Sequence, residues 1–246
     1  MASGGARQLL ASAVCSILTA ALAGVALAWM ANDALGLDER YLPRTVALLC
    51  AGGLLLLWRI VEHHPYQRVG PANQVTIARA VLVVLLAGLV GLSAPPRLHV
   101  AALAAATLAV VLDAVDGWLA RRTRMSSAYG ARFDMETDAL LILVLSLLAW
   151  EFDKAGPWVI ASGLARYVFL AASQVFRWMQ RPLFPSRRRK AVAVLQVVAL
   201  LVAVAAFVPR DVSSPLCAAA LAVLAWSFAL DVAWLRHRAC DARAVR

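Results

Sequence analysis

Four aspartates lie within 26 residues of one another, in two pairs whose spacing matches the helical repeat. Asp113 and Asp116 are three residues apart, and Asp134 and Asp138 are four apart, so each pair shares one helix face. An ionised carboxylate inside a membrane helix costs about 2.5–3.5 kcal/mol on insertion scales, which makes such residues functional candidates. If the two faces meet, the four carboxylates repel one another and require cations. Because oxygen-only donors suit Mg²⁺ or Mn²⁺, we predict that all four aspartates hold a pair of these ions.

The residues beside the aspartates indicate a phosphorylated substrate. Arg121 lies about one helical turn beyond Gly117 and can offer a bidentate guanidinium group to phosphate oxygens. Gly117 and Gly130 have no side chain, so a ligand can approach the backbone closely at both positions. Divalent ions would neutralise a diphosphate and polarise its phosphorus. The plainer alternative is a structural ion-pair network between the aspartates and nearby arginines.

The composition identifies the elements that must position these residues. Hydrophobic residues make up 63% of the 246 residues, charged residues make up 15%, and the mean hydropathy is +0.76. Soluble domains are about 45–50% apolar and about 25% charged, so the chain is predicted to be a polytopic membrane protein. This excludes a disordered chain, a secreted disulfide scaffold and an ordinary cytosolic enzyme. The net charge of +10 comes from basic residues between apolar stretches, which favours loops beside anionic lipid over nucleic acid.

Eight stretches are apolar enough to form membrane-spanning helices of about 20 residues, which predicts an all-α fold. They are residues 9–31, 43–60, 73–93, 98–120, 132–150, 156–177, 190–208 and 214–235. With the N-terminus in the cytoplasm, 18 Lys and Arg residues, Arg79 among them, are assigned to the cytoplasmic side and five to the opposite side. Because cytoplasmic loops are enriched in Lys and Arg, we predict that both termini are cytoplasmic. The aspartates then lie at the cytoplasmic ends of the fourth and fifth helices.

The segment from Asp113 to Asp138 also resembles a known family. Its pattern, D-x-x-D-G-x-x-A-R, eight residues, then G-x-x-x-D-x-x-x-D, is the signature of the CDP-alcohol phosphotransferases, integral membrane enzymes also called CDP-alcohol phosphatidyltransferases. The fixed positions are met by Asp113, Asp116, Gly117, Ala120, Arg121, Gly130, Asp134 and Asp138. The resemblance covers about residues 71–236 and implies a six-helix core. We therefore predict two extra N-terminal transmembrane helices in residues 1–62 and a catalytic core in residues 63–246.

The resemblance implies a metal-dependent transferase that moves a substituted phosphate from a CDP-linked donor to an alcohol and releases CMP. The donor is expected to be CDP-diacylglycerol, so that the enzyme synthesises a phospholipid. In the family the first three aspartates hold the metal pair and the fourth helps. The fourth, here Asp138, also resembles the general base that deprotonates the acceptor hydroxyl. CDP and its diphosphate are expected to contact Asn73, Thr76, Gly117, Ala120, Arg121, Ser127 and Gly130.

The acceptor is expected to be an alcohol whose own phosphate binds basic residues, such as glycerol 3-phosphate or inositol phosphate. The residues assigned to it are Arg166, Arg187, Arg188, Arg189 and Lys190. For Arg166 the alternative is pairing within the helix bundle, and for the other four it is ordinary charge beside anionic lipid. The family resemblance further implies a homodimer, and the short cationic chain is expected in a bacterial inner membrane.

Three other functions remain open at this point. A transferase of the same family could take a soluble CDP-alcohol as donor and diacylglycerol as acceptor. A cation-coupled transporter could line its path with aspartates, although here they cluster at one face and no paired interrupted helices are evident. A non-catalytic membrane scaffold is the third, and the intact motif argues against it.

Overall fold

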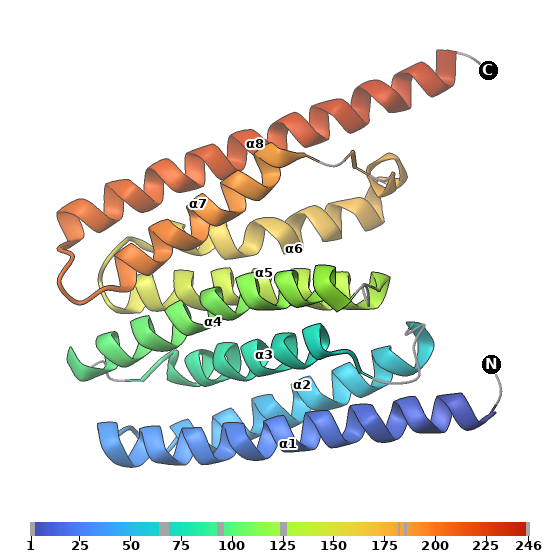
Figure 1. Ribbon diagram of the computed structural model, residues 1–246. Helices are drawn as coiled ribbons and strands as arrows, with labels where there is room; N and C mark the ends of the chain where they lie inside the picture. Colours follow the sequence, from blue (N-terminus) through green and yellow to red (C-terminus); the bar gives the residue numbers. More distant parts are fainter. Residues whose placement is uncertain are drawn as a thin grey trace. The chain divides into compact units, whose positions relative to one another are not determined.

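The computed structural model describes residues 3–63, 69–92, 96–123, 127–181, 183–184 and 186–244, and within these every regular element is a helix (Figure 1). The α-helices are α1 (Ser3–Leu35), α2 (Tyr41–His63), α3 (Pro71–Leu89), α4 (Pro96–Thr123), α5 (Ala128–Glu151), α6 (Ile160–Val175), α7 (Arg187–Val204) and α8 (Arg210–Ala244). Two short 3₁₀ helices, η1 (Pro157–Val159) and η2 (Arg177–Gln180), flank α6. The predicted all-α fold is confirmed, and each predicted stretch corresponds to one of these eight helices.

Six of the described helices are long and apolar enough to cross a membrane: α1, α2, α3, α4, the η1–α6 segment and α8. The other two carry several charged residues in their first halves. Arg132, Asp134, Glu136 and Asp138 lie in the first half of α5, and α7 begins with four consecutive cationic residues, Arg187–Lys190. The predicted total of eight membrane-spanning helices therefore stays a prediction.

The contacts divide the chain into two compact units, residues 1–144 and residues 145–246. The first unit contains α1 to α4 and the first two thirds of α5, and it therefore holds all four aspartates of the motif. The second contains the end of α5, α6, α7 and α8. The predicted division of the chain after residue 62 is a different one, based on family resemblance, and it stays a prediction.

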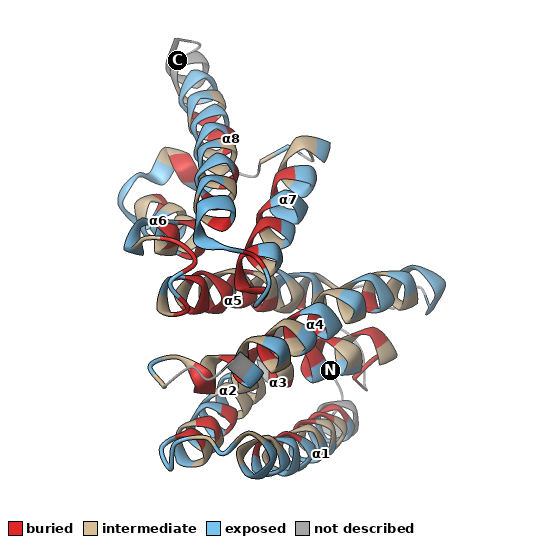
Figure 2. Cartoon of the chain, turned by 90° about the vertical axis from the view of Figure 1, so that its left-hand side faces the viewer, coloured by how far each residue is buried: buried red, intermediate tan, exposed pale blue. Residues whose placement is uncertain are grey.

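In the first unit, α1 and α2 form a hairpin that packs on α3. Helix α1 ends at Leu35, where Gly36 has a left-handed φ of 61° and the Leu37 amide donates to the Asn32 carbonyl, a glycine-based helix end. Much of α1 and α2 is exposed (Figure 2). The exposed residues include large apolar ones, among them Leu22 and Leu54, as expected of surfaces that face lipid.

The contact between α2 and α3 is unusually close at Gly88. A Cβ atom at that position would lie 2.2 Å from Thr45 Oγ1 and 3.0 Å from a ring carbon of Tyr41, so only glycine fits without movement. Both Thr45 and Tyr41 are buried. The Arg44 guanidinium group donates to the Val90 carbonyl just beyond the end of α3. These contacts fix the N-terminal hairpin against α3 at the end of α3 away from Arg79.

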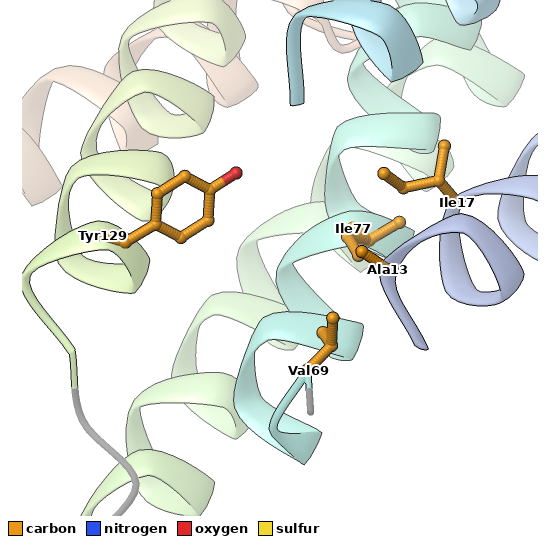
Figure 3. Packing of buried hydrophobic residues seen from close by; sticks show 5 residues of the cluster. All are labelled: Ala13, Ile17, Val69, Ile77 and Tyr129. Atoms are coloured by element: carbon orange, nitrogen blue, oxygen red, sulfur yellow. The ribbon is translucent and has the colours of Figure 1, made fainter. Parts of the chain in front are cut away.

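At the other end of the hairpin, a small hydrophobic cluster joins three helices (Figure 3). Ala13 and Ile17 from α1 pack with Ile77 of α3, with Val69 just before α3, and with Tyr129 from α5. The Tyr129 hydroxyl donates to the Leu56 carbonyl of α2, at 3.3 Å. Because Tyr129 directly precedes Gly130 of the motif, this cluster sets the position of the first turn of α5.

The second unit contains a buried lysine whose charge is satisfied by the backbone. Lys154 Nζ donates to the Val208 and Ala206 carbonyls, at 2.6 and 3.3 Å, and the Ser213 hydroxyl donates to the Lys154 carbonyl. This lysine thereby connects the turn after α5 to the turn between α7 and α8. Beside it, Asp153 has a positive φ of 53° and pairs with Arg210.

Candidate metal and nucleotide site

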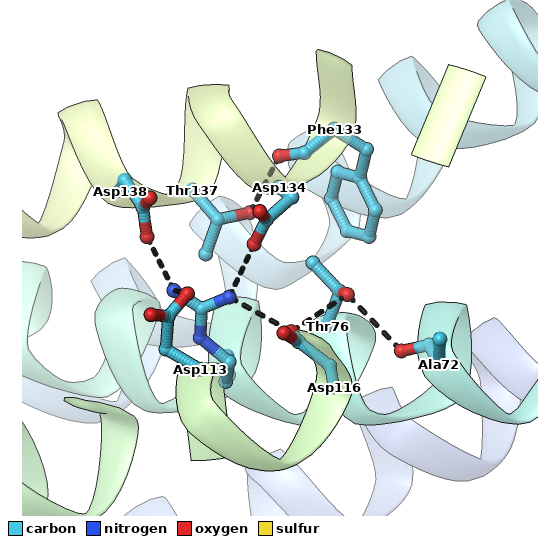
Figure 4. A network of polar contacts seen from close by, with 9 residues as sticks. Ala72, Thr76, Asp113, Asp116, Phe133, Asp134, Thr137 and Asp138 are labelled. Carbon is cyan, nitrogen blue, oxygen red and sulfur yellow. Dashed lines mark hydrogen bonds and ion pairs between the residues drawn. The ribbon is translucent and has the colours of Figure 1, made fainter. Parts of the chain in front are cut away.

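The two aspartate pairs meet, as their spacing predicts. Asp113 and Asp116 lie on the second half of α4, and Asp134 and Asp138 lie on the first half of α5 (Figure 4). One carboxylate oxygen from each of Asp113, Asp116 and Asp134 lies within 4.8 Å of the other two. Asp138 is not part of this group of three, but it contacts the same guanidinium group as they do.

That guanidinium group belongs to Arg79, which extends from α3 and contacts all four aspartates. Its NH1 lies 2.8 Å from Asp116 Oδ2 and 2.5 Å from Asp134 Oδ1. Its NH2 lies 2.9 Å from Asp113 Oδ1 and also pairs with Asp138 Oδ1. The Arg79 side chain is 1% exposed, so this is a buried charge placed among carboxylates. An ion-pair network thus does exist among the aspartates, and its cation comes from another helix.

Three of the four carboxylates that contact Arg79 are also partly exposed. The side chains of Asp113, Asp134 and Asp138 are 46%, 39% and 45% exposed, whereas that of Asp116 is 6% exposed. Arg79 contacts a single oxygen of each carboxylate. Three of the four aspartates therefore combine a buried contact with an accessible side from which a ligand can approach.

Asp116 has a second support from α3. Thr76 is buried, and its hydroxyl lies 3.0 Å from Asp116 Oδ2 and 3.1 Å from the Ala72 carbonyl (Figure 4). A hydroxyl has one hydrogen, so Thr76 donates to one of these two acceptors at a time. The structure thus places Thr76 on an aspartate, and its assigned contact with the nucleotide stays a prediction.

The other residues assigned to the nucleotide fall into two groups. Asn73, Ser127 and Gly130 lie together, because a Cβ at Gly130 would be 2.6 Å from Asn73 Oδ1 and 3.2 Å from Ser127 Oγ. Ser127 also caps α5, accepting a hydrogen bond from the Gly130 amide at 3.0 Å. In the second group, on α4, a guanidinium nitrogen of Arg121 lies 3.4 Å from the place where a Gly117 Cβ would be. Ala120 lies on the same helix and is partly exposed.

Comparison with known proteins decides the family. The family model for CDP-alcohol phosphatidyltransferase matches residues 70–232, about two thirds of the chain. The chain belongs to the CDP-alcohol phosphatidyltransferase family. Neither the curated proteins nor the solved structures gave a match. Membership confirms the resemblance carried by the aspartate motif and, together with the six apolar helices, shows an integral membrane protein. Helices α1 and α2 lie outside the matched segment.

A CDP-alcohol phosphatidyltransferase transfers a phosphate-containing group from a CDP-alcohol, and the family generally depends on a divalent metal. The aspartate cluster fits such an ion. All its donors are carboxylate oxygens, three of them are already gathered, and each carboxylate has an oxygen that Arg79 does not contact. Hard dications with oxygen ligands match this donor set. Asp113, Asp116 and Asp134 are the residues that would hold it.

Arg79 is a residue of this phosphatidyltransferase site that was not predicted from the sequence. Arg79 was assigned only to the cytoplasmic side, which stays a prediction, whereas the structure shows it buried within α3. The signal was present in the sequence: one arginine stands inside an otherwise apolar stretch, residues 73–93. An intramembrane charge must face a partner or a cavity, and the rule that selected the aspartates applies equally to this arginine.

The basic residues assigned to the acceptor lie on α6 and α7, in the second unit. Two of them are paired there with α8: Arg188 and Arg189 contact Asp231 Oδ1 at 2.5 and 3.3 Å. Arg188 also donates to the carbonyl and hydroxyl of Ser227, at 2.7 and 3.0 Å. Arg187 and Lys190 are exposed, and Arg166 is partly buried on α6. The assignment of all five to the acceptor stays a prediction, and it is weakest for the two with partners on α8.

Proposed function

We propose that the protein is a phospholipid-synthesising enzyme that transfers a phosphatidyl group from CDP-diacylglycerol to an alcohol and releases CMP. The observation that carries this proposal is the aspartate cluster, with three carboxylate oxygens within 4.8 Å of one another and Asp138 beside them. Such a cluster suits the diphosphate of a CDP-linked donor only when divalent cations lie between the two. Mg²⁺ or Mn²⁺, as a pair of ions, is the proposed cofactor.

The donor is proposed to bind through both groups of residues around the cluster. Arg121, over Gly117, would form paired hydrogen bonds to the diphosphate, because its planar guanidinium group matches phosphate oxygens. Asn73, Ser127 and Gly130 would contact the cytidine side of the donor. Gly130 has no room for a side chain against Asn73, so its backbone is accessible only as glycine. Thr76 and Ala120 complete the proposed surface.

Asp138 is proposed to be the general base. The proton of the acceptor hydroxyl moves to the Asp138 carboxylate while the acceptor oxygen bonds to the β-phosphorus of the donor. The bond from that phosphorus to the bridging oxygen breaks, and CMP leaves with that oxygen. The bound metal pair would supply charge neutralisation on the diphosphate. The contact with Arg79 fixes the orientation of Asp138, and its 45% exposure leaves it accessible to an acceptor.

The acceptor is proposed to be a phosphorylated polyol, such as glycerol 3-phosphate or inositol phosphate. Its phosphate would bind the cationic residues of α6 and α7. Arg187 and Lys190 are exposed, whereas Arg188 and Arg189 would first have to leave Asp231. The bias of Lys and Arg along the chain supports cytoplasmic termini in a bacterial inner membrane, and we propose a homodimer there.

The test is CMP release by the purified protein with CDP-diacylglycerol and either Mg²⁺ or Mn²⁺. Glycerol 3-phosphate, inositol, inositol phosphate and serine are offered separately. Asp138→Asn should abolish release, and Asp153→Asn is the matched control, because it makes the same change at an exposed aspartate outside the proposed site. Metal-dependent release with one acceptor, lost only in Asp138→Asn, supports the proposal.

Absence of CMP release with every acceptor would contradict the proposed donor. Diacylglycerol with a soluble CDP-alcohol is then the informative second assay, because the same family supports that reaction. Release in the second assay alone would reverse the roles of donor and acceptor while leaving the aspartate site in place. Release that is unaffected by chelation would overturn the metal-dependent mechanism.

A further inference from the structure

We propose that Arg79 is a positioning residue that acts as the resident counter-cation of the aspartate cluster. It keeps the four carboxylates together when no divalent ion is bound, and it lowers the affinity of the cluster for such ions. This inference rests on the proposed metal site and concerns how this chain balances its charge. Arg79 precedes the aspartate motif by more than 30 residues and enters the site from α3, a helix that contributes no aspartate.

The contacts of Arg79 show that its charge is committed to the cluster. Both terminal nitrogens lie on carboxylates, two to each nitrogen. Its Nε is buried and makes no hydrogen bond within the described part of the chain. The guanidinium group contacts four carboxylates although one of its donors stays unpaired. We infer that attraction to the carboxylates determines its position. Packing alone does not require such an arrangement.

Charge balance gives Arg79 its effect on metal binding. Four carboxylates face one guanidinium group, so the cluster remains strongly anionic and still attracts dications. Removing Arg79 would make the cluster more anionic. Even at the dielectric constant of water, a unit charge about 5 Å from a divalent ion changes the affinity by about tenfold. Arg79 therefore weakens metal binding while it allows the metal-free protein to remain folded.

A packing role and a charge-balancing role make different predictions for a variant without the charge. If Arg79 only fills space, its loss lowers the melting temperature equally with and without metal. If it balances charge, its loss destabilises mainly the metal-free protein, where no divalent ion opposes the repulsion of the aspartates. Metal then restores much of the stability, because a ligand that binds only the folded state stabilises it according to its affinity.

The experiment measures the melting temperature of Arg79→Met, Arg79→Lys and the unaltered protein in detergent, in EDTA and in Mn²⁺. Mn²⁺ binding is followed in parallel by electron paramagnetic resonance. We expect the Mn²⁺-dependent rise in melting temperature to be larger in Arg79→Met than in the unaltered protein. The Kd for Mn²⁺ should fall by about tenfold. Arg79→Lys keeps the charge but offers three donors to four acids, so it should lie between the two.

The matched control is Arg44→Met. Arg44 is a partly buried arginine of the same unit whose partner, the Val90 carbonyl, is far from the aspartates. Its loss should lower the melting temperature equally in EDTA and in Mn²⁺ and leave the Kd for Mn²⁺ unchanged. Equal losses in both conditions for the Arg79 variants, as for Arg44→Met, would overturn the inference.

Two further results keep the test decisive if Arg79→Met does not fold. The unaltered protein must remain folded in EDTA, because Arg79 is proposed to suffice there, and unfolding on chelation would overturn the inference. Arg79→Lys must lose more stability in EDTA than in Mn²⁺. Failure of the proposed function is separate: it would appear as absent CMP release in the unaltered protein, whatever the melting temperatures of the variants. Absence of Mn²⁺ binding in every variant would remove both the metal site and this inference.

Discussion

The hydroxyl of Thr76 lies 3.0 Å from Asp116 Oδ2, a contact between α3 and α4 at the most buried of the four aspartates. Asp116 thus receives two contacts from α3, one from Thr76 and one from Arg79, both at the same oxygen. Its other oxygen remains for a metal ion. The geometry of the cluster therefore depends on α3 as much as on the two helices that carry the acids.

Thr76→Val tests this support, because it removes the hydroxyl and keeps the shape of the side chain. We expect a loss of about 1 kcal/mol in the free energy of unfolding and a higher Mn²⁺ concentration for half-maximal activity. Thr123→Val is the control, since the Thr123 hydroxyl is exposed and bonds only to Leu119 within its own helix. An unchanged metal requirement in Thr76→Val would show that Asp116 is oriented without it.

Substitution of Asp138 should lower the catalytic rate, whereas substitution of Asp116 should weaken metal binding. Asp138→Asn is expected to lower kcat by about 10²–10⁴-fold, the usual contribution of a general base, while Mn²⁺ still binds. Asp116→Asn should instead weaken Mn²⁺ binding, because Asp116 belongs to the group of three gathered oxygens and Asp138 does not. Mn²⁺ titration followed by single-turnover CMP release measures both quantities. Equal loss of Mn²⁺ affinity in the two variants would contradict the separate roles.

Gly130→Ala should raise the KM for the CDP-linked donor. The added Cβ would lie 2.6 Å from Asn73 Oδ1, so Asn73 or the first turn of α5 must move. Gly52→Ala is the matched control, because nothing lies within 4 Å of the Cβ it adds on α2. Alanine is favoured over glycine in a helix by about 1 kcal/mol, so the control should be neutral or slightly stabilising. A normal donor KM in Gly130→Ala would place the donor elsewhere.

Gly88→Ala should separate the N-terminal hairpin from α3. Its Cβ would lie 2.2 Å from Thr45 Oγ1, and overpacking of this kind costs about 1–3 kcal/mol of stability. Thr45→Ala removes the atom in conflict, so the double variant should recover part of the loss. A double-mutant cycle of melting temperatures measures this coupling. Additive losses would mean that the two helices adjust at this contact without strain.

The sequence predicts much of this fold, because the apolar stretches are long and separated by charges and prolines. It also predicts that Asp113, Asp116, Asp134 and Asp138 share one site, since their spacing sets the helix face locally. The contact of Arg79 with the aspartates could not be predicted from spacing, because it depends on the packing of α3 against α4. Asp231 of α8 pairs with Arg188 and Arg189 of α7, two of the residues assigned to the acceptor. The spacing of residues along the chain did not predict which arginines assigned to the acceptor would pair with Asp231.

The order of charges along the chain has a consequence for how the protein enters the membrane during synthesis. Arg79 emerges 37 residues before Asp116 and 59 before Asp138. An arginine at the centre of a lone helix opposes insertion by about 2.5–3.5 kcal/mol, so α3 must be accepted on the strength of its apolar residues and of the hairpin already beside it. The aspartates of α4 and α5 are synthesised later, when Arg79 is already present to pair with them. Each helix that carries aspartates can thus pair with Arg79 as soon as it has been synthesised. In the reverse order the four aspartates would precede their cationic partner.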